Sequence, residues 1–130
     1  MINQAVAAEP EVVVDTSNWK EYTNKTYGFS FKYNPDWQIK QFVKKGDFNL
    51  LEIDPGKKYY NIKIYVSQNE FFAMGGLPIK ETIISGLKAS NVADLLYGIQ
   101  KEPDYFTFDN GQSVSLKPQF NALVNSLKFE

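Results

Sequence analysis

The chain has 130 residues, enough for one globular domain with a real hydrophobic core, and its apolar content of 43% and aromatic content of 15% exclude a disordered composition. Its net charge of -1, with lysine as every one of the 14 basic residues, gives no general attraction to nucleic acid or to anionic membranes. Histidine and cysteine are absent, which removes residues that many enzymes use for proton transfer and thiol chemistry, so we predict a protein that is not an enzyme and holds no cofactor.

Residues 1–18 predict a flexible N-terminal tail, followed by a single globular domain at 19–130. The tail has no sustained amphipathic period, and chain ends are usually loose. The alternative is that the run from Glu11 to Val14 adds a strand to the edge of a sheet. One hypothesis for the tail is that an export signal, cut away in the mature protein, precedes Met1 in the native gene.

The segment from Gly28 to Tyr33 alternates aromatic and polar residues with period two, which predicts a strand with its aromatic side chains on one face. Asn34, Pro35 and Asp36 are turn formers and end this strand. Trp37 follows directly, and we expect it to be a buried structural residue that closes the corner.

Residues 38–66 predict a three-stranded antiparallel meander. Its strands are expected at 38–43, 48–53 and 60–66, with turns at 44–47 and 54–57 between them. The register of the first strand stays open, because Ile39 and Phe42 are opposed in phase. In the last strand, Ile62, Ile64 and Val66 are expected to point inward.

The second half of the chain mixes two periodicities. Residues 79–85 predict a strand, whereas 90–100 are ambiguous, since their apolar residues also fit a helical spacing with Asn91 as a cap. Asp109-Asn110-Gly111 is a strong turn signal and predicts a hairpin between 105–108 and 113–116. A helix follows, with proline in its first turn and an apolar stripe formed by Phe120, Leu123, Val124 and Leu127.

The run from Tyr27 to Tyr33, followed by Pro35 and Trp37, resembles the opening of PsbP-like domains. These are relatives of the extrinsic photosystem II subunit and include many bacterial exported lipoproteins of unknown role. The C-terminal run 120–129 is similar to the closing helix and strand of those lipoproteins, although Leu127 stands where that pattern tends to have phenylalanine. Asn34 is inserted between the tyrosine and the proline of the family pattern, and 67–104 holds no motif that aligns.

The resemblance implies an α+β fold in which a central antiparallel sheet is flanked by helices, an α/β/α-type sandwich with the C-terminal helix packed on the sheet. It also implies a strand just after Gly86, against the helical alternative for that region. Photosystem function, calcium and manganese do not carry over, because no binding residue of this chain matches one.

Several acidic residues are candidates for a metal or acid–base site. Glu102, Asp104 and Asp109 are dense enough to suggest an oxygen-ligand site for a cation, but turn and loop roles are favoured, and no metal is expected. Glu52 and Asp54 share one face of a strand, as paired catalytic carboxylates would, but ordinary surface charge is favoured.

The candidate partner contact is the apolar segment 71–78. It gathers Phe71, Phe72, Met74 and Leu77 in a connection with two glycines and a proline. The alternative is a short helical turn that buries these side chains on the sheet, which is the commoner fate of apolar clusters.

These features lead us to expect a monomeric, non-catalytic binding or assembly module with a protein partner, located outside the cytoplasm and lipid-anchored in its native form. No apolar run is long enough to span a membrane. The alternative is a small-ligand carrier with an aromatic-lined cavity. A carrier needs an internal pocket of a few hundred Å³ with a few polar groups, whereas an assembly module needs an exposed apolar patch.

Overall fold

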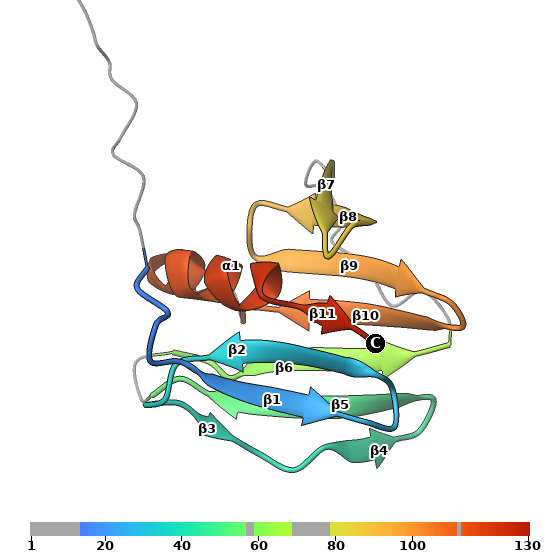
Figure 1. Cartoon of the computed structure of the whole chain (residues 1–130), viewed down its shortest axis with the longest axis horizontal. Coiled ribbons are helices and arrows are strands. Elements are labelled where there is room, and N and C mark those ends of the chain that lie inside the picture. The colour runs from blue at the N-terminus through green and yellow to red at the C-terminus, as the bar shows by residue number, and fades with distance from the viewer. Residues whose placement is uncertain (1–13, 57–58, 69–78, 112) are drawn as a thin grey trace, which may run out of the picture.

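The computed structural model describes residues 14–56, 59–68, 79–111 and 113–130 (Figure 1). The strands among them are β1 (Lys20–Asn24), β2 (Phe29–Tyr33), β3 (Gln38–Ile39), β4 (Val43–Lys45), β5 (Phe48–Asp54), β6 (Ile62–Ser67), β7 (Lys80–Ile84), β8 (Leu87–Val92), β9 (Leu96–Lys101), β10 (Asp104–Asp109) and β11 (Lys128–Phe129). The helical elements are a 3-10 turn at Val114–Leu116 and the helix α1 at Lys117–Asn125. None of the helices in this described part has the length and apolar character needed to cross a membrane.

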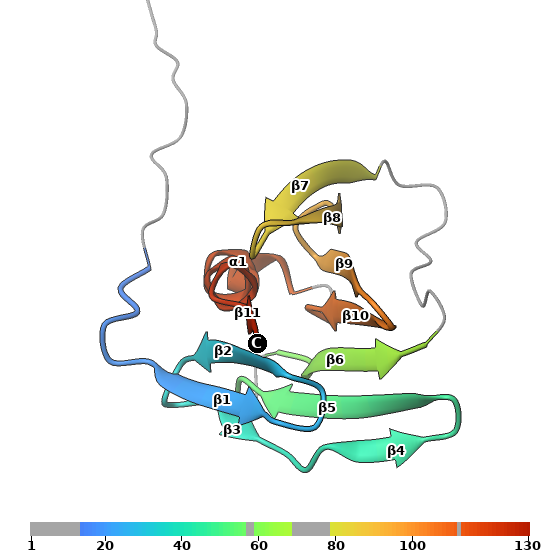
Figure 2. The same ribbon diagram turned by 45° about the vertical axis from the view of Figure 1, so that its right-hand side comes forward.

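Two antiparallel sheets form the molecule. The large sheet has the order β3-β5-β6-β10-β9-β8-β7, with β4 also paired to β5, and the small sheet has the order β1-β2-β11. The small sheet and α1 lie on the same side of the large sheet (Figures 1 and 2). Phe29 of β2 contacts Phe106 of β10, and Phe120 of α1 contacts Tyr97 of β9, so the small sheet and the helix cover neighbouring parts of one face.

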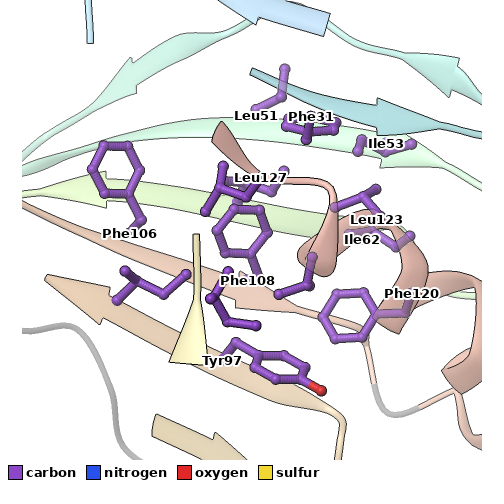
Figure 3. Packing of buried hydrophobic residues seen from close by; sticks show 14 of the residues in the cluster. Phe31, Leu51, Ile53, Ile62, Tyr97, Phe106, Phe108, Phe120, Leu123 and Leu127 are labelled. Carbon is purple, nitrogen blue, oxygen red and sulfur yellow. The ribbon is translucent and has the colours of Figure 1, made fainter. Parts of the chain in front are cut away.

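The core fills the space between these layers (Figure 3). Two aromatic pairs join the layers edge to face, with centroids 5.1 Å apart for Phe29 and Phe106 and 6.5 Å apart for Phe31 and Phe108. Each fully buried side chain of this size contributes about 1.5–3 kcal/mol relative to exposure. The largest fully buried side chains are Phe29, Phe31, Phe106, Phe108, Phe120, Leu51, Ile53, Ile62, Ile64, Ile99, Leu116 and Leu123.

The predicted strand at 28–33, the burial of Trp37 and the antiparallel meander are confirmed. Trp37 is only 6% exposed and packs against Trp19 with ring centroids 5.7 Å apart. The meander is present, and its inward-facing isoleucines are fully buried. Its first strand is broken into β3 and β4, which pair with opposite ends of β5, and this break resolves the conflict in phase between Ile39 and Phe42.

The expected layering is wrong in one respect. The sheet is not flanked by helices, because α1 is the only α-helix in the described residues and it lies on one face. The rest of that face is covered by strands, since the first and last parts of the chain pair with each other as β1, β2 and β11. The expected packing of the C-terminal helix on the sheet is confirmed, with Phe120, Leu123 and Val124 buried.

The predicted hairpin between 105–108 and 113–116 is also wrong. Both edges of β10 are already occupied, by β6 and by β9, so no edge is free for a following strand. The turn signal still acts locally, because the Asp109 carboxylate accepts a hydrogen bond of 2.8 Å from the backbone N–H of Gly111. The chain then leaves the sheet and enters the 3-10 turn and α1.

The ambiguous region 90–100 forms the end of β8, the turn after it and most of β9 rather than a helix. These strands are joined through Ala93 and Asp94, whose φ angles are 54° and 58°. Asn91 caps this turn: its side-chain oxygen accepts the backbone N–H of Asp94 at 2.9 Å. Of the apolar residues that fit a helical spacing, Val92, Leu96 and Ile99 are buried from two adjacent strands, and Leu95 is half-buried in the turn between them.

Candidate functional site

Four neighbouring strands of the large sheet change from apolar to polar at the same end of their inner face. Residues two apart on a strand share a face, so the change can be followed along each strand. It runs from Leu51 to Asn49 on β5, from Val66 to Gln68 just beyond β6, from Phe106 to Asp104 on β10, and from Ile99 to Lys101 on β9. The inner face therefore ends in a polar margin where the two layers part.

Two adjoining depressions open at this margin, with volumes of about 490 and 520 Å³. They share Tyr27, Gln68 and Asp104 and therefore form one feature, which we call the Tyr27 groove. The β1–β2, β4–β5 and β9–β10 turns surround it, together with the end of β6 and β11, at the right-hand end of Figure 1.

Tyr27 is held in place from both layers. Its backbone N–H donates to the side-chain oxygen of Asn24 at 3.0 Å within the β1–β2 turn. Its hydroxyl accepts a hydrogen bond of 2.7 Å from the amide of Asn49 on β5. Its ring meets Phe42 edge to face, with centroids 5.7 Å apart. Because the β1–β2 turn fixes its backbone while Asn49 and Phe42 hold its side chain, Tyr27 forms a preorganised wall of the groove.

The groove is locally acidic. Its charged lining residues are Lys44, Asp47, Lys101, Glu102, Asp104 and Glu130, so two lysines face four carboxylates and the local charge is -2, against -1 for the whole chain. The carboxylate of Glu102 already has a hydrogen-bond partner within the chain, because it accepts a bond of 2.6 Å from the side-chain amide of Gln100.

Asp104 is the carboxylate at the centre of the groove. Burial raises the pKa of its carboxyl above the ordinary value. The groove thus offers a partly desolvated carboxylate, two amides, two amines and a phenol. These groups suit binding through hydrogen bonds and charge.

The candidate contact residues named from the sequence, Phe71, Phe72, Met74 and Leu77, lie outside the described residues. Their role as a partner contact stays a prediction.

The acidic residues named from the sequence do not meet in one place. Glu102 and Asp104 line the groove, whereas Asp109 lies at the opposite end of β10 and lines a separate depression beside Glu52. Glu52 accepts the amide of Asn61 at 2.9 Å, and Asp54 accepts the backbone N–H of Gly56 at 2.9 Å. In the part of the chain that the structure describes, no three residues of the metal-ligating types come together.

Sequence reasoning did not single out Tyr27, Asn49 and Gln68 as site residues. A signal was present for two of them, because Asn49 and Gln68 occupy the inward phase of strands whose other inward residues are apolar. The alternation along each strand does not reveal the order of the strands in the sheet. It therefore cannot show that these positions line one groove.

The interior of the described part holds side chains where a carrier would need space. Phe106 is in ring contact with Phe29 and with Phe129, with centroids 5.1 and 5.0 Å apart. The depressions that can be described lie at the surface, and the lining of the groove is mainly polar.

No protein-family model matches this chain, and no curated protein matches it in sequence. Its structure is similar to the solution structure of cyanobacterial PsbP (CyanoP) from Synechocystis sp. PCC 6803, with a TM-score of 0.60 and 12% sequence identity over 95% of this chain and 98% of that chain. At this identity the likeness shows the fold alone. The chain has a PsbP-like fold, and the resemblance seen in the opening and closing runs is confirmed at that level.

Proposed function

We propose that this chain is a non-catalytic binding or assembly module that works outside the cytoplasm and holds a segment of a partner protein in the Tyr27 groove. The observation that carries the proposal is the groove itself, where four adjacent strands end their inner face in polar residues beneath a fixed tyrosine. The location outside the cytoplasm is supported by the PsbP-like fold and by the resemblance to exported lipoproteins.

The shape and chemistry of the groove favour a protein segment over a small apolar ligand. Small-molecule pockets are mostly apolar and enclose their ligand, whereas this groove is open and its amides and charges are spread along its length. An extended polypeptide presents backbone N–H and C=O groups at regular intervals, and the side chains of Asn49, Gln68 and Tyr27 can exchange hydrogen bonds with such groups.

Site-specific photocrosslinking tests the proposal. A benzophenone amino acid replaces Gln68 at the centre of the groove or, as the matched control, Lys88, which is exposed on β8 and lines neither depression of the groove. We expect one discrete adduct from Gln68 in intact source cells and none from Lys88. The crosslinked protein is then purified and titrated against the chain at a temperature where both variants are folded, and Tyr27→Ala should weaken its binding.

Two results would contradict the proposal. Equal adducts from both positions would mean that the groove has no selectivity, and a purified partner that binds Tyr27→Ala as well as the original chain would place its contact elsewhere. Cell fractionation tests the location separately, since recovery with the cytoplasmic fraction, rather than with the osmotic-shock fluid or the membranes, would contradict an extracytoplasmic role.

A further inference from the structure

We infer that Asp104 is the receptor in the Tyr27 groove for a lysine side chain of the partner segment, an inference that rests on the proposed function. Asp104 continues the inner row of β10 that begins with the buried residues Phe108 and Phe106. Its carboxylate therefore stands where the apolar face opens to solvent, and it belongs to both depressions of the groove.

The carboxylate of Asp104 lies in a groove that carries more carboxylates than lysines. Lys101 is its direct cross-strand neighbour on β9, and burial raises the pKa of the Asp104 carboxyl. Burial without a compensating charge penalises the ionised form, and a cation placed against Asp104 would offset that penalty. The local excess of carboxylates over lysines favours a positive ligand for the same reason.

The surroundings of Asp104 suit the long stem of a lysine. Tyr27, Pro103 and Phe129 line the same depression and offer apolar surface. Lysine buries its methylene chain along such surface while its ammonium group reaches a polar partner. Gln68 shares the depression with Asp104, and its side-chain oxygen can accept a second hydrogen bond from the ammonium group.

Nuclear magnetic resonance titration of the labelled full chain tests this inference. The probes are the peptide acetyl-Gly-Ser-Lys-Ser-Gly-amide and the same peptide with norleucine in place of lysine, which keeps the stem and removes the charge. We expect the lysine peptide at millimolar concentration to shift the backbone amides of Tyr27, Gln68 and Asp104, and the norleucine peptide to leave them unchanged. Equal shifts with both peptides, or none with either, would overturn the inference.

Two carboxylate variants separate a local ion pair from a general effect of charge. Asp104→Asn should weaken the lysine peptide at least about tenfold, as expected for a lost charge-assisted hydrogen bond. Glu102→Gln removes the same charge from the same groove, but that carboxylate is already engaged by Gln100, so its effect should be under about threefold. The melting temperature of Asp104→Asn should be unchanged or higher, which a merely structural role would not give. Equal effects of the two variants would contradict the inference.

Failure of this inference can be told apart from failure of the proposed function. If the Gln68 photocrosslink forms equally well in the Asp104→Asn background, the groove holds its partner without an ion pair, and only the role of Asp104 falls. If the lysine peptide binds as expected but photocrosslinking at Gln68 yields no adduct in cells, the ion-pair site is supported and the proposed assembly role is contradicted.

Discussion

Leu123→Ala tests whether α1 seals the core. Leu123 is 0% exposed and points from the helix toward the large sheet (Figure 3). The substitution removes three buried carbons, worth about 2.4 kcal/mol at about 0.8 kcal/mol each, and the cavity that remains adds to this cost. We therefore expect the free energy of unfolding to fall by about 2–5 kcal/mol. For a chain of 130 residues the entropy of unfolding is about 0.27 kcal/mol/K, so a loss of about 3 kcal/mol lowers the melting temperature by about 11 °C.

Chemical denaturation measures this loss directly, with the slope against denaturant as a check that the unfolded state is the same. Asn125→Ala is the matched control, since Asn125 lies exposed on the same helix and donates only to the backbone oxygen of Asn121. Its effect should stay within about 0.5 kcal/mol. An effect near zero for Leu123→Ala would refute the reasoning, because it would mean that the helix is not docked on the core.

Three further substitutions probe single contacts. Tyr97→Phe should cost about 0.5–1.5 kcal/mol in denaturation, because the buried hydroxyl donates to an asparagine oxygen on α1 at 2.7 Å. Gly111→Ala should destabilise the fold more than Gly46→Ala. Both glycines have φ near +65°, but only at Gly111 would the new Cβ lie 2.8 Å from the Cβ of Tyr60. Equal losses of stability in the two variants would contradict this prediction. Asp104→Asn should be at least as stable as the original chain at neutral pH. The raised pKa of Asp104 means that the folded state favours the protonated carboxyl. The stability that protonated Asp104 contributes is therefore fully present below pH 3.8 and is lost as pH rises through the folded pKa. A melting curve that shows Asp104→Asn less stable than the original chain at neutral pH would contradict this prediction.

The sequence was sufficient for those elements whose evidence is local. Alternation with period two placed β2 and β6 correctly, and the apolar stripe placed α1. Their signals were clear because each element buries one face, so the burial pattern is written into consecutive residues. Trp37 belongs to the same class, since its burial follows from the corner in which it lies.

The predictions that were wrong or left open depend on strand pairing or on turn geometry that consecutive residues do not reveal. The turn at Asn110 predicts a hairpin, but the pairing of β10 with β6 on one edge and with β9 on the other leaves no edge for a following strand. Between β8 and β9, Ala93 and Asp94 adopt positive φ angles without the glycine that usually marks such a turn, and the apolar spacing therefore looked helical. The covering of the sheet by strands likewise depends on the pairing of β11 with β2.

The candidate site lies where local and global preferences disagree. An apolar residue at position 104 would continue the inner row from Phe108 and Phe106 and extend the core, whereas the carboxylate found there is partly desolvated and costs stability when ionised. Departures of this kind from the otherwise consistent pattern of a fold are expected at functional positions. Asn49 and Gln68 depart from the pattern in the same direction on adjacent strands, and the fixed position of Tyr27 turns these departures into one preorganised surface. A site that is assembled before its partner arrives loses less entropy on binding, and this is the physical reason for placing the function of the chain in the groove.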